Sequence, residues 1–307
     1  MKSDLVAGSP VLPGGGMGHP TEKPMSKILV DAGPSERGWH GFENAARCLR
    51  YWAWGKVGGK KFAVTEPLVK GSLIHVGLAH YYQQKSVENP NDYYTPAEAI
   101  SVLAQQEADK AQDFNERNLW LSSVAPIVGA MDAYEHEYDS RCNWKVVAVE
   151  KELRAHIPIE KGSDDTFLFT QRADLIVEDG HGFKWIVDHK SCYRITGKTL
   201  RQFILSGQFL GYQVFGRKMY GSKFGGLILN RVKLSQPHGF DRCSLEPAPA
   251  AVSGFIRMLR QTEQRMRNHA HLTDPMDYPP VLSEQVCYGK YGQCPAFELC
   301  RWGDDDG

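Results

Sequence analysis

The spacing of apolar residues changes near residue 144, and this change restricts the fold more than any other feature of the chain. Before it, from about residue 37 to about residue 140, apolar residues recur with the spacing of amphipathic helices. After it, three segments alternate with a period of two, which is typical of half-buried strands: NWKVVAVEKEL, TFLFTQRADLIVED and FKWIVDHKS. Residues 179–182, Asp-Gly-His-Gly, join the last two segments and predict a hairpin.

The remaining segments predict helices on either side of these strands. GFENAARCLRYWAWGK predicts one helix, and LWLSSVAPIVGAMDAYEHEY predicts a longer one kinked at Pro126. TLRQFILSGQFLGYQVFGRKMYG predicts a helix that is followed by the strand FGGLILNRVKL and by a helix over residues 248–270. This order predicts an α/β fold with a mixed central sheet flanked by helices, preceded by an N-terminal helical portion.

We expect a single domain, because no internal repeat or long linker divides the chain. Residues 1–36 are rich in Gly and Pro and predict a flexible arm. The domain then spans residues 37–302. Its expected parts are a helical part at about 37–140, an α/β core at about 144–270 and a cysteine-rich tail at about 280–302.

Composition excludes several classes of protein. The 36 Lys and Arg residues balance 36 Asp and Glu residues, which argues against a histone-like polycation. No run of apolar residues is long enough to span a membrane, and no secretory signal opens the chain. The odd number of cysteines, seven, favours free thiols or metal ligands over a disulfide framework, and therefore a cytoplasmic location.

Charged residues end two of the predicted strands. Asp174 closes the alternating segment before the hairpin, and Asp188 and Lys190 close the segment after it. Residues two apart on a strand face the same side, so this acid and this base lie together. Two carboxylates can hold Mg²⁺ or Mn²⁺, and the lysine can orient or deprotonate a water or neutralise a phosphate. Alone, an Asp-x-Lys triplet is more often a surface ion pair.

Further residues in a fixed order strengthen the catalytic interpretation. Gly71 and His75 stand four apart on a predicted helix, and Gln208 and Tyr212 stand four apart on another. With the strand acids and the lysine, these residues resemble the PD-(D/E)XK nuclease superfamily, over roughly residues 40–302. Within it they resemble the RecB-like branch, which includes AddB and CRISPR-associated exonucleases. The resemblance implies a restriction-endonuclease-like core.

The resemblance also implies roles for individual residues. The metal ligands would be His75, Asp174 and Asp188. The catalytic residues would be Asp174, Asp188, Lys190, Gln208 and Tyr212. Either Glu150 or Glu152 is expected to add a carboxylate, and strand parity does not separate them. His80 is interpreted as a core histidine with satisfied hydrogen bonds.

The cysteines predict a second metal site. Cys287, Cys294 and Cys300 cluster near the C-terminus, and together with the remote Cys48 they suit a four-cysteine site. In the related nucleases this arrangement implies a [4Fe–4S] cluster. The six residues between Cys287 and Cys294, where the family has two, leave zinc or a three-cysteine site open. The other three cysteines are interpreted as small buried apolar residues: Cys142, Cys192 and Cys243.

The resulting functional prediction is a Mg²⁺- or Mn²⁺-dependent deoxyribonuclease, with exonuclease activity expected. DNA would be its partner, alongside recombination or replication proteins, in the cytoplasm of a bacterium or a phage-infected cell. The resemblance implies a role in DNA replication, recombination, repair or CRISPR-type adaptation. Tyr51, Trp52 and Trp54, among basic residues, predict a strand-binding surface or a packed helix. The alternative function is a DNA-binding or assembly module with a vestigial nuclease site and a structural Fe–S or zinc centre.

Overall fold

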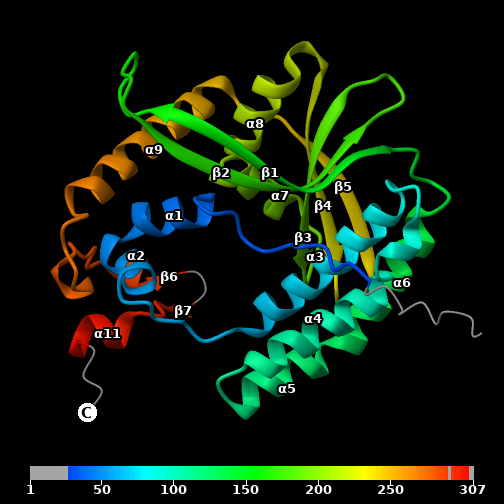
Figure 1. Cartoon of the computed structure of the whole chain (residues 1–307), viewed down its shortest axis with the longest axis horizontal. Helices are drawn as coiled ribbons and strands as arrows, with labels where there is room; N and C mark the ends of the chain where they lie inside the picture. Colours follow the sequence, from blue (N-terminus) through cyan, green and yellow to red (C-terminus); the bar gives the residue numbers. More distant parts are fainter. Residues whose placement is uncertain (1–26, 290–291, 304–307) are drawn as a thin grey trace, which may run out of the picture.

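A computed structural model describes residues 27–289 and 292–303 of the chain (Figure 1). The N-terminal portion is helical, as expected, and precedes the sheet. Its helices follow one another in this order: α1 (Trp39–Arg47), α2 (Leu49–Lys56), α3 (Glu66–Gln84), η1 (Pro90–Asp92), α4 (Pro96–Lys110), α5 (Phe114–Ser122) and α6 (Val124–Tyr138).

A five-stranded mixed sheet forms the centre of the molecule, which confirms the predicted fold class. Its strands lie side by side in chain order: β1 (Lys145–Pro158), β2 (Thr166–Glu178), β3 (Lys184–Cys192), β4 (Phe224–Lys233) and β5 (Gly239–Leu245). β2 and β3 form the predicted antiparallel hairpin, whereas β3 and β4 are parallel. A parallel pair needs a crossover, and α7 (Gly197–Ile204) and α8 (Gly207–Tyr220) provide it.

Helices cover both faces of the sheet and create two hydrophobic cores. α1, α2, α8 and α9 (Pro249–Asn268) pack on one face, around residues such as Phe169 and Phe209. α3 to α6 pack on the other face, around residues such as Leu175 and Val187. Neighbouring residues of a strand therefore point to different cores, as Ile186 and Val187 of β3 do. Figure 1 shows α9 and the α3–α6 group on opposite sides of the sheet.

Three helices expected to be continuous are interrupted. The first predicted helix is divided at Cys48, whose backbone is extended (φ −162°, ψ 117°), into α1 and α2. The predicted kink at Pro126 is instead a break at Ser123, and Pro126 lies in the first turn of α6, where proline is tolerated. The helix expected after β3 is divided into α7 and α8 at residues 205–206.

Two further expectations need correction. The predicted arm at residues 1–36 is too long, because residues 27–36 make specific contacts with the domain: Ile28 pairs with Tyr93, and the Val30 N–H donates to His80. Residues 1–26 lie outside the described residues. β5 was not predicted, since its polar residues weaken the alternation that marks a strand.

The C-terminal tail is assembled from short pieces beside α1 and α2. These pieces are η3 (Pro275–Asp277), α10 (Glu284–Cys287), β6 (Tyr288–Gly289), β7 (Gly292–Gln293) and α11 (Phe297–Trp302). Figure 1 shows them next to the helices that begin the described chain. Arg47 donates to the Val286 carbonyl and Arg50 to the Tyr278 carbonyl, so the two regions are directly connected.

Candidate active site

The two histidines of α3 have different environments, as expected. His80 is fully buried; its Nε2 accepts from the Val30 N–H and its Nδ1 lies 2.9 Å from the Tyr94 carbonyl. These contacts satisfy both ring nitrogens, and burial lowers the pKa of His80, so it is a neutral core residue. His75, five residues earlier, instead faces the strand acids, and its Nδ1 lies 3.4 Å from Asp174 Oδ2.

Neighbouring strands β2 and β3 bring the predicted carboxylates together, although Asp174 and Asp188 lie within these strands and not at their ends as expected. Asp188 is fully buried, and Asp174 is nearly so. Asp174 Oδ2 accepts a hydrogen bond from the backbone N–H of His189 at 2.7 Å. The His189 ring stacks on Tyr82, lies edge-on to the His75 ring with centroids 6.1 Å apart, and takes a hydrogen bond at Nδ1 from Asn230. The hairpin thus fixes the acids through its backbone as well as its side chains.

Glu150 joins this set, and Glu152 does not. Ligand atoms of His75, Glu150 and Asp174 all lie within 4.8 Å of one another. Glu150 has a left-handed backbone (φ 48°), which is rare for a residue other than glycine. This conformation interrupts the alternation of β1, so Glu150 and Glu152 do not share a face, and parity is a poor guide. Glu152 instead contacts Arg154, at 3.4 Å.

Asp188 is adjacent to this set but has another close partner. The expected ligands were His75, Asp174 and Asp188; the closest three in the described chain include Glu150 in place of Asp188. Asp188 Oδ2 lies 2.8 Å from the Lys190 ammonium.

Lys190 is held by a chain of hydrogen bonds that begins on α8. Its Nζ donates to Gln208 Oε1 at 2.9 Å, and Gln208 Nε2 donates to the Tyr212 hydroxyl at 3.0 Å. The Tyr212 hydroxyl donates to the Arg172 carbonyl at 2.6 Å and lies 3.3 Å from Asp188. Tyr212 is buried, so it positions Gln208 and Asp188 and does not reach solvent.

Burial and mutual repulsion shape the charges of the site. Burial, with Asp188 nearby, raises the pKa of Asp174 to about 6 despite the opposing effect of His75. Burial, with the Asp174 charge, holds the pKa of Glu150 well above its usual range. Burial alone would lower the pKa of Lys190, but Asp188 and Asp174 outweigh it, so the pKa is raised and Lys190 remains an ammonium. Without a metal ion, burial and mutual repulsion therefore make the charged forms of Glu150 and Asp174 unfavourable.

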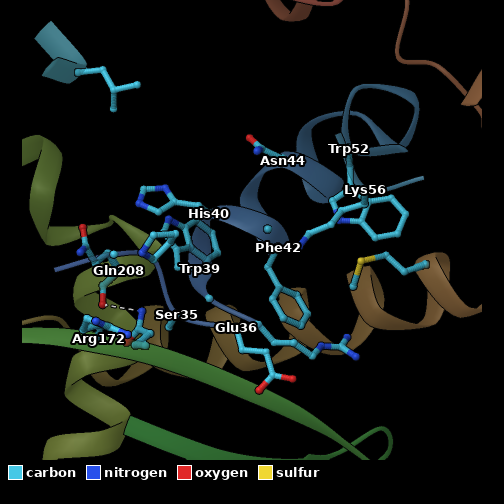
Figure 2. Close-up of a pocket in the computed structure, with 18 of the residues that line it drawn as sticks. Ser35, Glu36, Trp39, His40, Phe42, Asn44, Trp52, Lys56, Arg172 and Gln208 are labelled. Atoms are coloured by element: carbon cyan, nitrogen blue, oxygen red, sulfur yellow. Dashed lines mark hydrogen bonds between the residues drawn. The ribbon is translucent and has the colours of Figure 1, made fainter. Parts of the chain in front are cut away.

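A pocket of about 1380 Å³ opens over these residues. The side chains of the site line one part of it, and α1, α2 and the C-terminal end of α9 line the rest. Figure 2 shows Gln208 and Arg172 at one end and Trp52 and Lys56 at the other, with Trp39 between them. Arg172 was not singled out from the sequence, although its position two residues before Asp174 on a strand gives it the same face.

The aromatic segment predicted to bind a strand contributes only in part. Trp52 lines the pocket, but Trp54 is buried in the core. Tyr51 stacks on Phe62, with ring centroids 5.2 Å apart. Arg47 donates to a carbonyl of the tail. Most side chains of this segment therefore pack within the protein and do not face the pocket. The break at Cys48 turns them towards the core and the tail.

The four cysteines of the predicted second site lie in one region. The Val281 N–H donates to Cys48 Sγ, and Cys287 Sγ donates to the Val281 carbonyl. β6 and β7 pair antiparallel, and the Cys294 N–H donates to the Cys287 carbonyl at 2.7 Å. Burial raises the pKa of Cys294 and Cys300, and the nearby Cys48 adds to this effect for both thiols.

The other three cysteines are half-buried, not buried as expected: Cys142, Cys192 and Cys243. Two of them have charged partners, which an apolar environment would not supply. Arg242 donates to Cys142 Sγ at 3.2 Å, and Cys243 donates to Asp241 at 3.2 Å.

A comparison with protein families matches residues 40–301 to the PD-(D/E)XK nuclease superfamily. The chain belongs to this superfamily. The match covers the helical part, the sheet and the tail, and therefore every side chain of the site described above. It identifies the chain as a PD-(D/E)XK nuclease domain.

Solved structures and curated proteins add little to this assignment. A candidate exonuclease from Eubacterium rectale has a TM-score of 0.49 at 12% identity, with 86% of each chain covered. The crystal structure of SSO0001 has a TM-score of 0.32 at 14% identity, covering 63% of this chain and 84% of the other. Among curated proteins, none matches the chain. The family assignment therefore rests on the superfamily match.

Within the described residues, no helix has the length and apolar character needed to cross a membrane.

Proposed function

We propose that the protein is a RecB-like, Mg²⁺- or Mn²⁺-dependent deoxyribonuclease. The observation that carries the proposal is the approach of His75, Glu150 and Asp174, from three different elements, to within 4.8 Å of one another. With Asp188 beside them, these groups destabilise the site unless a cation neutralises them. Carboxylates with raised pKa values that gather in a cleft are typical of functional sites, so the arrangement favours a metal site.

The donor set suits a hard divalent cation. Carboxylate oxygens with one imidazole nitrogen fit Mg²⁺ or Mn²⁺ better than soft metals, which prefer thiolates. Such an ion supplies Lewis acidity and lowers the pKa of a water that attacks phosphorus. Glu150 and Asp174 would hold the ion, and the backbone N–H of His189 fixes the Asp174 carboxylate for this purpose.

The other residues of the site stabilise charge and fix geometry. Lys190 stays protonated, so it acts as a charged donor to the phosphate or the attacking water and not as the base. The Lys190 side chain is 27% exposed and lines the pocket, and Asp188 and Gln208 fix the direction of its ammonium. Tyr212 acts through Gln208 as a positioning residue.

The expected reaction is hydrolysis of DNA from an end, giving 5′-phosphate and 3′-hydroxyl products. The resemblance to RecB-like nucleases supports exonuclease activity, in DNA replication, recombination, repair or CRISPR-type adaptation in a prokaryotic or phage context. The pocket supports a nucleic-acid strand as substrate, because Trp39 and Trp52 offer aromatic surface for bases.

Lys190→Ala and Asp188→Asn test the proposal directly. We expect both variants to retain their fold by circular dichroism and to lose DNA degradation by at least about a hundredfold, with either Mg²⁺ or Mn²⁺. EDTA should abolish the wild-type activity. Comparing linear with covalently closed circular DNA distinguishes an exonuclease from an endonuclease. Full activity in both variants would refute the site assignment.

We further propose that Cys48, Cys287, Cys294 and Cys300 hold a [4Fe–4S] cluster. Four thiols from both ends of the domain, two of them around the Val281 peptide, support a common metal centre. Four thiolates around one zinc ion lie about 3.8 Å apart, given Zn–S bonds of about 2.3 Å. In the described chain, no three cysteine sulfurs lie within 4.8 Å of one another, which favours a cluster whose thiolates bind separate irons.

Purification without oxygen tests this second site. A brown protein that absorbs near about 400 nm and contains iron and acid-labile sulfide is the expected result. A colourless protein that contains zinc would instead support a single-ion site.

A further inference from the structure

A second cation lies beside the carboxylates. Arg172 is on β2, two residues before Asp174, and its side chain lines the pocket. Its positive charge acts on Glu150 and opposes the rise in the pKa of that residue. Only 18% of the side chain is exposed, so its guanidinium is largely removed from water.

The contacts of this guanidinium leave one of its hydrogen-bond donors, Nε, without an acceptor among the described residues. Nη1 donates to the backbone carbonyl of Asp31 and lies 2.9 Å from the Asp31 carboxylate. Nε is buried and has no hydrogen-bond partner among the described residues. A buried donor without a partner is unfavourable, and it is explained when a ligand supplies the missing acceptor. An arginine with a free edge is suited to the paired oxygens of a phosphate.

Three other cations on the pocket wall, Arg37, Arg267 and Lys190, already have acidic partners. Arg37 and Arg267 both bind Glu263, and Arg267 also binds Asp165. Lys190 is held by Asp188 and Gln208. Arg172 differs from these residues, because its one acidic partner, Asp31, is 77% exposed and contacts Nη1 alone among its donors.

We propose that Arg172 binds a phosphate of the DNA strand next to the carboxylates and so positions the strand over the metal site. This inference rests on the proposed nuclease function. Asp31 holds the guanidinium at Nη1 through its backbone carbonyl as well as its carboxylate. The carbonyl is retained when the Asp31 side chain is changed, so the Asp31 carboxylate is dispensable for binding, whereas the Arg172 side chain is not.

The test measures binding of fluorescein-labelled single-stranded DNA by anisotropy, with Mg²⁺ and over a range of salt concentrations. It is done in an Asp188→Asn background so that DNA is not degraded. We expect Arg172→Gln to weaken binding by about tenfold. The slope of log K against log salt should become shallower by about 0.7, as for the loss of one phosphate contact to a single strand.

Arg154→Gln is the matched control, since Arg154 is an ion-paired arginine on neighbouring β1, outside the pocket. It should leave both the affinity and the slope unchanged. Arg172→Gln behaving like Arg154→Gln would overturn the proposal. Asp31→Asn should bind DNA at least as tightly as the parent, because it removes an anion. If Asp31→Asn instead loses binding as Arg172→Gln does, Arg172 only anchors residues 31–38, and the proposal is wrong.

Arg172→Lys keeps the experiment decisive if Arg172→Gln does not fold. It retains the charge but not the guanidinium fork, so the salt slope should persist and the affinity should fall less than in the glutamine variant. A salt slope lost in the lysine variant would also overturn the proposal. Cleavage by otherwise unchanged Asp188→Asn protein would refute the nuclease site itself, so the two failures are distinguishable.

Discussion

The carboxylate site and the cysteine tail are built in opposite ways. The carboxylates project from the long strands β1, β2 and β3, with His75 of α3 beside them, and they repel one another in a rigid frame. The tail consists of very short elements, and neither α10 nor α11 buries a side chain fully. A rigid frame can hold groups that destabilise it, whereas a segment without its own core needs an external link. A cation should therefore complete the function of the first site and the structure of the second.

The largest expected effect separates Glu150 from Glu152. Glu150→Gln should reduce DNA cleavage by about a thousandfold, because it removes a ligand of the proposed ion. Glu152→Gln is the control on the same strand and should cleave at the wild-type rate. Initial rates in Mn²⁺, with calorimetric Mn²⁺ titration, measure both. Equal loss in the two variants would mean that the left-handed backbone at Glu150 does not direct the ligand.

The tail is tested by its cysteines. Cys48→Ser should lower the free energy of unfolding by about 3 kcal/mol or more in the metal-loaded protein, since the cluster would connect the two ends of the domain. Cys142→Ser, a half-buried thiol outside the tail, should cost less than about 1 kcal/mol. Denaturant unfolding under anaerobic conditions measures the difference. If both substitutions lowered the free energy of unfolding equally, the proposed cluster would have no structural role.

Burial and charge repulsion at Asp174 should make the stability of the metal-free protein depend on pH. The sign of this dependence is opposite to that for an ordinary ion-paired acid. Asp174 has a pKa of about 6 in the folded protein, against 3.8 as its ordinary value. The folded state therefore binds the proton more tightly, and metal-free stability falls as pH rises through this window. Asp174→Asn should stabilise the metal-free protein by up to about 3 kcal/mol at pH 7 and by almost nothing at pH 4. Thermal unfolding in EDTA measures this; a gain that does not depend on pH would contradict it.

The smallest expected effect concerns the anchoring of the tail. Arg50 donates to the carbonyls of Tyr278 and Met276. Arg50→Ala should cost about 1 kcal/mol in the metal-free protein and less when the tail is loaded with metal. Arg141→Ala, which removes an exposed ion pair with Glu137, should cost less than about 0.5 kcal/mol. Limited proteolysis of the tail provides an independent measurement, and unchanged cleavage in Arg50→Ala would show that these contacts do not retain it.

The sequence predicted the parts of the molecule that depend on regular periodicity. Strand alternation located Asp174 and Asp188, and the helical spacing of Gln208 and Tyr212 put both side chains in one hydrogen-bonded chain with Lys190. These predictions succeed because side-chain direction in a regular element follows from residue number alone.

The rest depends on contacts between segments that are distant in the sequence. The left-handed Glu150 and the extended Cys48 are exceptions to periodicity, and no local composition indicates them. The contacts of residues 27–36 involve His80, which is 50 residues from Val30, and Arg172, which is 141 residues from Asp31. Arg172 lacks a motif of its own, so its place beside Glu150 becomes visible only in three dimensions.

The hydrogen bond from the His189 N–H to Asp174 has a consequence for how freely this position can vary. The middle residue of the Asp-x-Lys triplet supports the metal site with a main-chain atom that nearly every amino acid possesses. Its side chain points into the opposite core and is constrained by packing against Tyr82 and Asn230. Substitution there can change shape and polarity without removing the bond to the carboxylate. Proline, which lacks the N–H, is the replacement that the site cannot accommodate.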